Sequence, residues 1–550
     1  MRVGLYLAYS PPNKKMSLKQ EGLGRYLAEL IRAFINNGDD VIVACPNWVV
    51  DSVEELVDDF GIEKNKIQYL LPKGESILYR LYLYRILKIK KTKKGKKIKK
   101  LAVHFIDQAI TIAISLKNIA LFSFLVFLSL VVFLLLMPLW ILLIIIMLGF
   151  KILQFLNSKT MHFSKKTITK PHIFVIEKLQ RIKPIHLLLD YIKTNYDAMI
   201  IQEKIRMASA EELIRHINHA VLNADIWYCP MAFWPEFNQI SGKKVICVPD
   251  VVTGEFSENF SKYDSAGATE KVRKTICGGT YFITYCNYIK ETLVEQYFGK
   301  KQENIAVIPH AINETLPYIN IQGNFVKKLN TKDPVMRFAK TLLPNLIDKN
   351  INMREYLGGN NYRFAFENVK YIFYPSQIRG NKNILTLVKA YKLVLRKYSH
   401  PIKLFLTCNY VMDKELTDYI YDHNLQHDVL SFFQVTNQQL AALYKCAELV
   451  VNPTLYEGGF PFTFGEGMSV GTPSIMSDIP QVREETQNYE LSDMLFDPYD
   501  HEKLAEKIVY GLENRSKLIE KETPLYQKMC KRDWKTVGQE YINVFKKFAS

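Results

Sequence analysis

Residues 452–473 read NPTLYEGGFPFTFGEGMSVGTP, which puts one glutamate in a glycine-rich loop and another near the start of an expected helix. Carboxylates accept paired hydrogen bonds from vicinal hydroxyls, and glycine lets a backbone come close to a ligand. The start of the helix also offers N–H groups to a diphosphate. Glu457 and Glu466 are therefore candidate ligand-binding residues. Composition alone leaves a second interpretation open, in which Glu457 is a surface charge and Glu466 complements the helix dipole.

Strands and helices alternate over most of the chain. In the second half the sequence predicts strands at 371–374, 403–407, 429–433, 449–451 and 473–476, and helices at 383–397, 413–423, 437–447 and 463–470. In the first half it predicts strands at 2–10, 40–45, 198–202, 226–229, 244–248, 281–285 and 305–308, and helices at 24–35, 209–224 and 289–298. Such alternation predicts an α/β protein with two doubly wound parallel sheets.

The length of 550 residues suits two domains with additions. We expect a first domain over 1–313, a connector over 314–367, a second domain over 368–533, and a closing helix over 534–550 that packs back on the first domain. A basic and apolar insertion, residues 79–184, interrupts the first domain. The connector is expected to be extended, with some helix.

Positive charge is concentrated in one place. The formal net charge is +17, and nine lysines lie between Lys88 and Lys100, so about half of the excess belongs to this run. Such a run is typical of a solvated loop, a nucleic-acid contact or a contact with an anionic membrane surface. The eight cysteines form no C-x-x-C pair, which predicts reduced thiols in a cytosolic protein rather than a disulfide framework or a zinc site. The first residues, MRVGLYLAYS, read as a strand, and we expect no cleavable signal peptide.

Residues 119–150 form an almost unbroken apolar run without a charged side chain. As one helix the run would extend about 48 Å, which exceeds the roughly 30 Å hydrocarbon core of a bilayer. Pro138 would bend or break that helix. Both flanks are basic, and basic flanks favour the cytoplasmic side. We therefore expect an uneven, membrane-associated hairpin on the cytoplasmic face, with Lys88–Lys100 on anionic lipid and no nucleic-acid partner.

Several motifs resemble, in order, those of the retaining family-four (group 1) glycosyltransferases with the GT-B fold. In that family a Pro-Ser-x-x-Glu-Gly loop precedes a helix that carries Glu-Ala-Met-Ala-x-Gly-x-Pro, and here YEG at 456–458 and EGMSVGTP at 466–473 match. VIPHAIN at 307–313, QLAALY at 439–444 and LFDP at 495–498 match as well. The resemblance covers nearly the whole chain apart from the insertion and the connector.

The resemblance implies two Rossmann-like domains facing across a cleft and a nucleotide-sugar donor, with Glu457 on the donor sugar and Glu466 on the ribose. The other candidate donor-binding residues are Gly458, Gly459, Phe460, Gln377, Gly22 and Gly24. Gly22 and Gly24 lie in EGLGRY, a glycine turn entering a helix, which lets backbone N–H groups approach a phosphate or a sugar. A plain tight turn is the commoner explanation of two such glycines.

The chain departs from the family pattern in the spacing of the glutamates, which are nine positions apart instead of eight. A second departure lies in YPSQIRGNKN, residues 374–383, which keeps Lys382 but has Gln377 where an arginine is usual. Arg379 is the candidate for the missing cation, because two cations facing a departing diphosphate stabilise its developing charge. We expect Glu457, Lys382 and Arg379 to be the catalytic residues. A solvated lysine at the start of a helix is the other interpretation of Lys382.

The third departure is VPDV at 248–251, where the family often has His-Asp. This replacement puts a histidine contact with the donor sugar in doubt and makes Asp250 a candidate on the acceptor side. His310, at the end of an expected strand, is the other acceptor-side candidate. A structural histidine fits that position at least as well.

Together these features predict a metal-independent, retaining hexosyltransferase without a cofactor or a protein nucleophile. It would move a sugar from a nucleoside diphosphate sugar to a lipid-linked saccharide or other glycan at the cytoplasmic membrane face, as in polysaccharide biosynthesis. The alternative is a non-catalytic membrane scaffold that keeps the fold. Gln377 and the altered glutamate spacing leave that alternative open.

Overall fold

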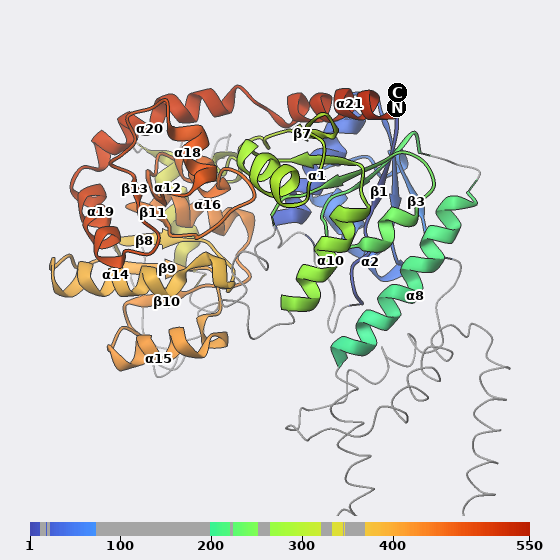
Figure 1. Cartoon of the computed structure of the whole chain (residues 1–550). Coiled ribbons are helices and arrows are strands. Elements are labelled where there is room, and N and C mark those ends of the chain that lie inside the picture. Colours follow the sequence, from blue (N-terminus) through green and yellow to red (C-terminus); the bar gives the residue numbers. More distant parts are fainter. Residues whose placement is uncertain are drawn as a thin grey trace, which may run out of the picture.

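The computed structural model of this chain describes residues 1–11, 18, 22–72, 198–220, 224–250, 265–320, 333–344, 346 and 369–550. Two β-sheets, each flanked by helices, form two domains in this part of the chain (Figure 1). Every strand pairing among the described residues is parallel. The predicted pair of doubly wound parallel sheets is therefore confirmed.

The first sheet has the strand order β3-β2-β1-β4-β5-β6-β7. Its strands are β1 (Arg2–Tyr6), β2 (Asp40–Ala44), β3 (Ile67–Leu70), β4 (Ile226–Cys229), β5 (Lys244–Cys247), β6 (Tyr281–Thr284) and β7 (Ile305–Val307). The helices of this domain are α1 (Gly22–Asn36), α2 (Asn47–Asp59), α8 (Ala198–Asn218), α10 (Ser265–Gly278) and the π-type helix η5 (Ile289–Tyr297). Its short 3-10 turns are η2 (Lys64–Lys66), η3 (Pro235–Gln239) and η6 (Gln302–Asn304), and the turn η7 (Leu316–Tyr318) that follows packs against the second domain. The strands are rich in buried apolar residues because helices cover both faces of the sheet.

The second sheet has the order β10-β9-β8-β11-β12-β13. Its strands are β8 (Tyr371–Tyr374), β9 (Lys403–Leu406), β10 (Val429–Ser431), β11 (Leu449–Asn452), β12 (Ser474–Ser477) and β13 (Leu495–Phe496). Its helices and turns are α12 (Pro334–Leu342), η10 (Gly380–Lys382), α14 (Ile384–Arg396), η11 (Tyr410–Met412), α15 (Lys414–Asp422), α16 (Asn437–Cys446), α17 (Phe462–Met468), α18 (Pro480–Thr486), α19 (His501–Glu513) and α20 (Arg515–Cys530). The strand order reverses between β8 and β11, which pair directly. Loops that follow two such neighbouring strands diverge and create a binding position at their carboxyl ends.

The strand predicted at 198–202 is wrong, because these residues begin α8, a helix that continues to Asn218. A short apolar run such as AMIIQ does not distinguish a strand from a buried helical segment. The helix predicted at 209–224 is the second half of α8 and ends earlier than expected. The sequence analysis also missed α2, β3 and α10.

Part of the expected connector belongs to the second domain. Helix α12 packs against α16, and Ala339 and Leu343 share a hydrophobic cluster with Phe373 and Phe405 of the second sheet. The cluster buries one apolar face of α12, so this helix is an integral layer of the domain. The apolar residues of α12 repeat at helical spacing over only a short stretch, and polar sequence surrounds them. The sequence therefore predicts an extended connector there.

The last helix, α21 (Trp534–Ala549), runs back from the second domain and packs on α1 of the first (Figure 1). The hydroxyl of Tyr26 on α1 hydrogen-bonds the hydroxyls of Tyr541 on α21 and Tyr228 on β4, the latter at 3.0 Å. Burial raises the pKa of all three phenols, so they stay protonated and can donate. Buried hydroxyls that satisfy one another fix the position of α21 on the first domain.

Within the residues that the structure describes, none of the helices has both the length and the apolar character required to cross a membrane. The predicted hairpin at 119–150 and the Lys88–Lys100 run lie outside the described residues.

The contact between α21 and α1 leaves no room for a side chain at Gly538, where an added Cβ would lie 2.5 Å from Cβ of Ala33. Replacing Gly538 with valine should separate the helices and lower the free energy of unfolding by about 1–3 kcal/mol, as overpacking does. Urea unfolding followed by circular dichroism measures the change. Gln539→Val, on the exposed side of the same helix, is the matched control and should shift the midpoint much less. Equal shifts for the two variants would contradict the packing.

Candidate functional site

An ion pair joins the two residues that the sequence analysis placed at the centre of the site. Nζ of Lys382 lies 2.5 Å from Oε1 of Glu457, and their side chains are 22% and 20% exposed. Lys382 ends the turn η10 after β8, and Glu457 lies in the loop after β11. Because β8 and β11 are neighbours at the reversal of strand order, the fold brings the two loops together.

Two asparagines that the sequence analysis did not single out hold this pair in place. Asn381 is buried; its side-chain amide donates to the carbonyl of Tyr456 at 3.1 Å, and its carbonyl accepts from the backbone N–H of Leu455 at 2.8 Å. Asn383 has a left-handed backbone with φ of 52°, and its amide donates to the carbonyls of Pro453 at 3.0 Å and Pro498 at 2.7 Å. The signal for both was the motif GNKN, since asparagine is enriched at left-handed positions and in turns.

The glycines after Glu457 let this loop touch the first domain. A Cβ on Gly458 would lie 2.3 Å from the carbonyl oxygen of Pro249, and a Cβ on Gly459 would lie 3.0 Å from Cβ of Tyr285. Cys286 of the first domain also donates a hydrogen bond from Sγ to the carbonyl of Gly458 at 3.6 Å. Any side chain at Gly458 would push the loop away from the first domain, so a glycine is required there.

Glu466 lies on α17 with most of its side chain buried, and its two carboxylate oxygens face different domains. Tyr444 donates its hydroxyl to Oε2 at 2.5 Å, and burial together with the nearby carboxylate raises the pKa of Tyr444 well above its usual value. Arg25, from α1 of the first domain, places Nη1 3.5 Å from Oε1. The hydroxyl of Thr315 donates to the carbonyl of Glu466 at 2.7 Å. The sequence analysis missed Arg25, although it directly follows the glycine turn.

The remaining donor-binding candidates with a described environment are Gly22, Gly24 and Phe460. Gly22 begins α1, and Gly24 meets the backbone of Leu18, whose carbonyl oxygen would lie 1.9 Å from an added Cβ. Phe460 packs its ring edge-on against Phe464 at 5.4 Å between centroids. The expected glycine turn is thus tightly packed at Gly24.

Arg379 and Gln377 are both exposed. Among the described residues, no hydrogen bond or ion pair joins the Arg379 side chain to Lys382 or Glu457. The structure therefore does not bring Arg379 to the pair, and its role as the second cation stays a prediction.

His310 and Asp250, the acceptor-side candidates, lie at the carboxyl ends of β7 and β5. The ring of His310 stacks on Phe462 of the second domain at 3.9 Å between centroids, and its Nδ1 lies 3.2 Å from the carbonyl of Ala311. Burial lowers the pKa of His310 to about 4, so the ring is neutral at physiological pH. Asp250 is half-buried and adjoins Pro249, which touches the Gly458 loop.

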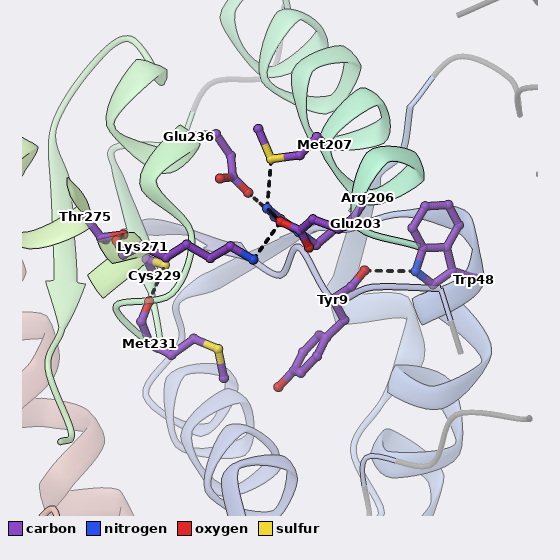
Figure 2. Close-up of polar contacts among 10 residues, drawn as sticks. All are labelled: Tyr9, Trp48, Glu203, Arg206, Met207, Cys229, Met231, Glu236, Lys271 and Thr275. Carbon is purple, nitrogen blue, oxygen red and sulfur yellow. Dashed lines mark hydrogen bonds and ion pairs between the residues drawn. The ribbon is translucent and has the colours of Figure 1, made fainter. Parts of the chain in front are cut away.

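A second polar cluster lies deeper in the first domain, close to the carboxyl end of β4. Figure 2 shows Arg206 of α8 reaching both Glu236 and Glu203, with Lys271 of α10 also at Glu203. Although burial alone would raise it, hydrogen bonds from Arg206 and Lys271 lower the pKa of Glu203 to about 2. Arg206 and Glu236 are almost fully buried, and this network anchors α8 to its neighbours.

The order of elements and the geometry of the site agree with the comparisons to known proteins. A family model described as glycosyl transferases group 1 matches residues 362–529, which include Lys382, Glu457 and Glu466. The match covers most of the second domain and less than half of the chain. An uncharacterized glycosyltransferase of Methanocaldococcus jannaschii is 25% identical over 203 residues, which are 36% of this chain and 49% of that protein. The match therefore spans about half the length of the relative.

Solved structures share the architecture of this chain at low sequence identity. HepE of Anabaena, solved in complex with UDP and glucose, has a TM-score of 0.53 at 10% identity, and the match covers 100% of both chains. A variant of TarM from S. aureus, solved with UDP among its ligands, has a TM-score of 0.50 at 11% identity over 99% of both chains. These likenesses confirm the GT-B fold.

The pKa of His310 predicts how stability depends on pH. The folded value of about 4 lies below the ordinary value of 6.5, so the unfolded chain binds a proton more readily between these two values. The contribution of His310 to the free energy of unfolding is therefore complete above pH 6.5. It is lost as the pH falls toward 4. We expect His310→Gln to lose less stability than the wild type between pH 7 and about pH 4.5, measured as urea midpoints.

His219→Gln, at an exposed position of the same domain, is the control and should follow the wild-type pH profile. A parallel profile for His310→Gln would show that the ring is not held neutral by burial.

Proposed function

We propose that this chain is a group 1 glycosyl transferase that moves a sugar from a nucleoside diphosphate sugar to an acceptor hydroxyl, with retention at the anomeric carbon. The observation that carries the proposal is the Lys382–Glu457 pair, held by Asn381 and Asn383 beside the first domain. A carboxylate suited to sugar hydroxyls and a cation suited to a diphosphate are thereby placed together. The complexes of HepE with UDP and with UDP-glucose support a nucleotide-sugar donor.

In this reaction the bond from the anomeric carbon to the diphosphate oxygen breaks, and a bond to the acceptor oxygen forms on the same face. Negative charge develops on the leaving diphosphate, and Lys382 is the residue placed to stabilise it. Glu457 accepts hydrogen bonds from hydroxyls of the donor sugar and so orients the anomeric carbon. The acceptor proton passes to an oxygen of the leaving diphosphate, so no nucleophile or base from the protein is required.

Contacts between the domains support a site built from both. Glu484 of α18 accepts the backbone N–H of Asn287 at 2.9 Å and of Tyr288 at 3.3 Å, at the start of η5 in the first domain. The Gly458 loop of the second domain also touches Pro249 of the first domain. These contacts keep the carboxyl ends of the two sheets together, where enclosure removes water from the reacting groups.

We propose a lipid-linked saccharide as the acceptor and the cytoplasmic membrane face as the location. Support comes from the sequence alone, from the apolar run 119–150 and the lysines between Lys88 and Lys100. Anionic lipid attracts such a basic segment next to an apolar one. The scaffold alternative, without catalysis, makes the opposite prediction for turnover of the donor.

Lys382→Ala should lower donor turnover by about 100- to 1,000-fold, because a group that stabilises developing charge is lost. Glu457→Gln should also lower turnover by at least about tenfold, since the neutral amide binds sugar hydroxyls less strongly than the carboxylate. Transfer or hydrolysis of a panel of nucleoside diphosphate sugars by purified protein, with membranes as acceptor, measures both.

Lys403→Ala is the matched control, because Lys403 also pairs with a carboxylate, Asp428, but lies at the start of β9, away from the carboxyl ends of the strands. It should turn over the donor like the wild type. No turnover by the wild type with any donor would favour the scaffold. Full turnover by Lys382→Ala would reject the assigned role of that lysine.

Deleting residues 119–150 should release the protein from membranes and leave donor hydrolysis intact, because the described site residues lie outside that run. Flotation of the full chain and of the deletion variant with anionic vesicles measures attachment, and the hydrolysis assay shows that the variant is folded. A full-length chain that stays soluble without detergent and does not float would reject the membrane location.

A further inference from the structure

Arg25 reaches across from the first domain to a carboxylate of the second. Its Nη1 lies 3.5 Å from Oε1 of Glu466, and its Nη2 donates to the side-chain carbonyl of Asn437 at 3.2 Å. The contact with Glu466 is at the outer limit of a hydrogen bond, so the guanidinium is held loosely there. The Arg25 side chain is 28% exposed, so solvent reaches it.

The backbone that carries Arg25 is closely packed on both sides of this residue. Gly24 is in contact with the backbone of Leu18. Tyr26 hydrogen-bonds Tyr228 and Tyr541 in the buried cluster on α21. The first turn of α1 is thus fixed on both sides of Arg25. A cation in the first turn of a helix is not favoured by the helix dipole, so stability of α1 does not explain the residue.

Each of the two expected donor-binding carboxylates is paired with one cation. Lys382 pairs with Glu457, and Arg25 pairs with Glu466. Both carboxylates thus hold a cation in the structure. A nucleoside diphosphate sugar brings hydroxyl groups that hydrogen-bond carboxylates, together with a diphosphate that attracts cations.

We infer that Arg25 is a further donor-binding residue, supplied by the first domain, which leaves Glu466 and binds the diphosphate when the nucleotide arrives. The inference rests on the proposed function. Lys382 and Arg25 then provide two cations for the diphosphate from opposite domains, while Glu457 and Glu466 accept hydroxyls. Arg25 therefore also makes donor affinity depend on the contact between the domains. Arginine suits this role because its planar fork binds two phosphate oxygens at once.

Binding of a nucleoside diphosphate and of its parent nucleoside separates this role from a structural one. The probes are uridine, guanosine and adenosine with their diphosphates, and the pair that the wild type binds is then used in calorimetric titrations of the full chain. Arg25→Gln should weaken diphosphate binding about 10- to 100-fold, as expected for the loss of charged hydrogen bonds. Nucleoside binding should stay unchanged, because the nucleoside lacks the phosphates.

Arg273→Gln is the matched control, since Arg273 of the first domain also pairs with a glutamate, but its partner Glu270 lies on the same helix, α10. It should bind both probes like the wild type. If Arg25→Gln does not fold, Arg25→Lys carries the test: it keeps the charge but loses the fork, so diphosphate binding should weaken less and nucleoside binding should stay unchanged.

Equal weakening of nucleoside and diphosphate by the Arg25 variants would overturn the inference, because it would mean that Arg25 only positions Glu466. Unchanged binding of both probes would overturn it too. In either case a wild type that binds the diphosphate leaves the proposed function standing. A wild type that binds none of the three diphosphates would overturn both.

Discussion

The close approach of the Gly458 loop to the first domain is the constraint on which the site depends. The carbonyl of Pro249 occupies the space that a side chain at position 458 would need. Glu457 precedes this contact directly, so its carboxylate is fixed at the junction of the two domains. The remaining features of the site, from the Lys382 pair to the His310 stack, lie around that point.

Buried amides and hydroxyls keep the second-domain side of this junction in place. Asn381 and Asn383 join the turn before α14 to the loop after β11. Tyr444 fixes one oxygen of Glu466. Each of these donors satisfies an acceptor that would otherwise be buried without a partner. Because an unsatisfied buried group is costly, a displacement of either partner is strongly disfavoured.

Sequence reasoning succeeded where a local pattern sets the structure and failed where packing does. Most second-domain strands were predicted, because they are short apolar runs between turns. The run 198–202 has the same appearance, yet it begins α8, whose Arg206 contacts Glu236 and Glu203. The sequence predicts a connector at α12, because the apolar face of this short helix is buried only by its packing against α16.

The sequence alone is sufficient to predict the class of fold and to single out Glu457, Glu466 and Lys382 as candidates, because their motifs are local and ordered along the chain. Only the tertiary structure decided that Arg25 faces Glu466, 441 positions away, and that Arg379 does not reach the Lys382–Glu457 pair. The physical reason is that a residue's partners depend on how elements from two domains pack together, and neither spacing nor periodicity along the chain contains that information.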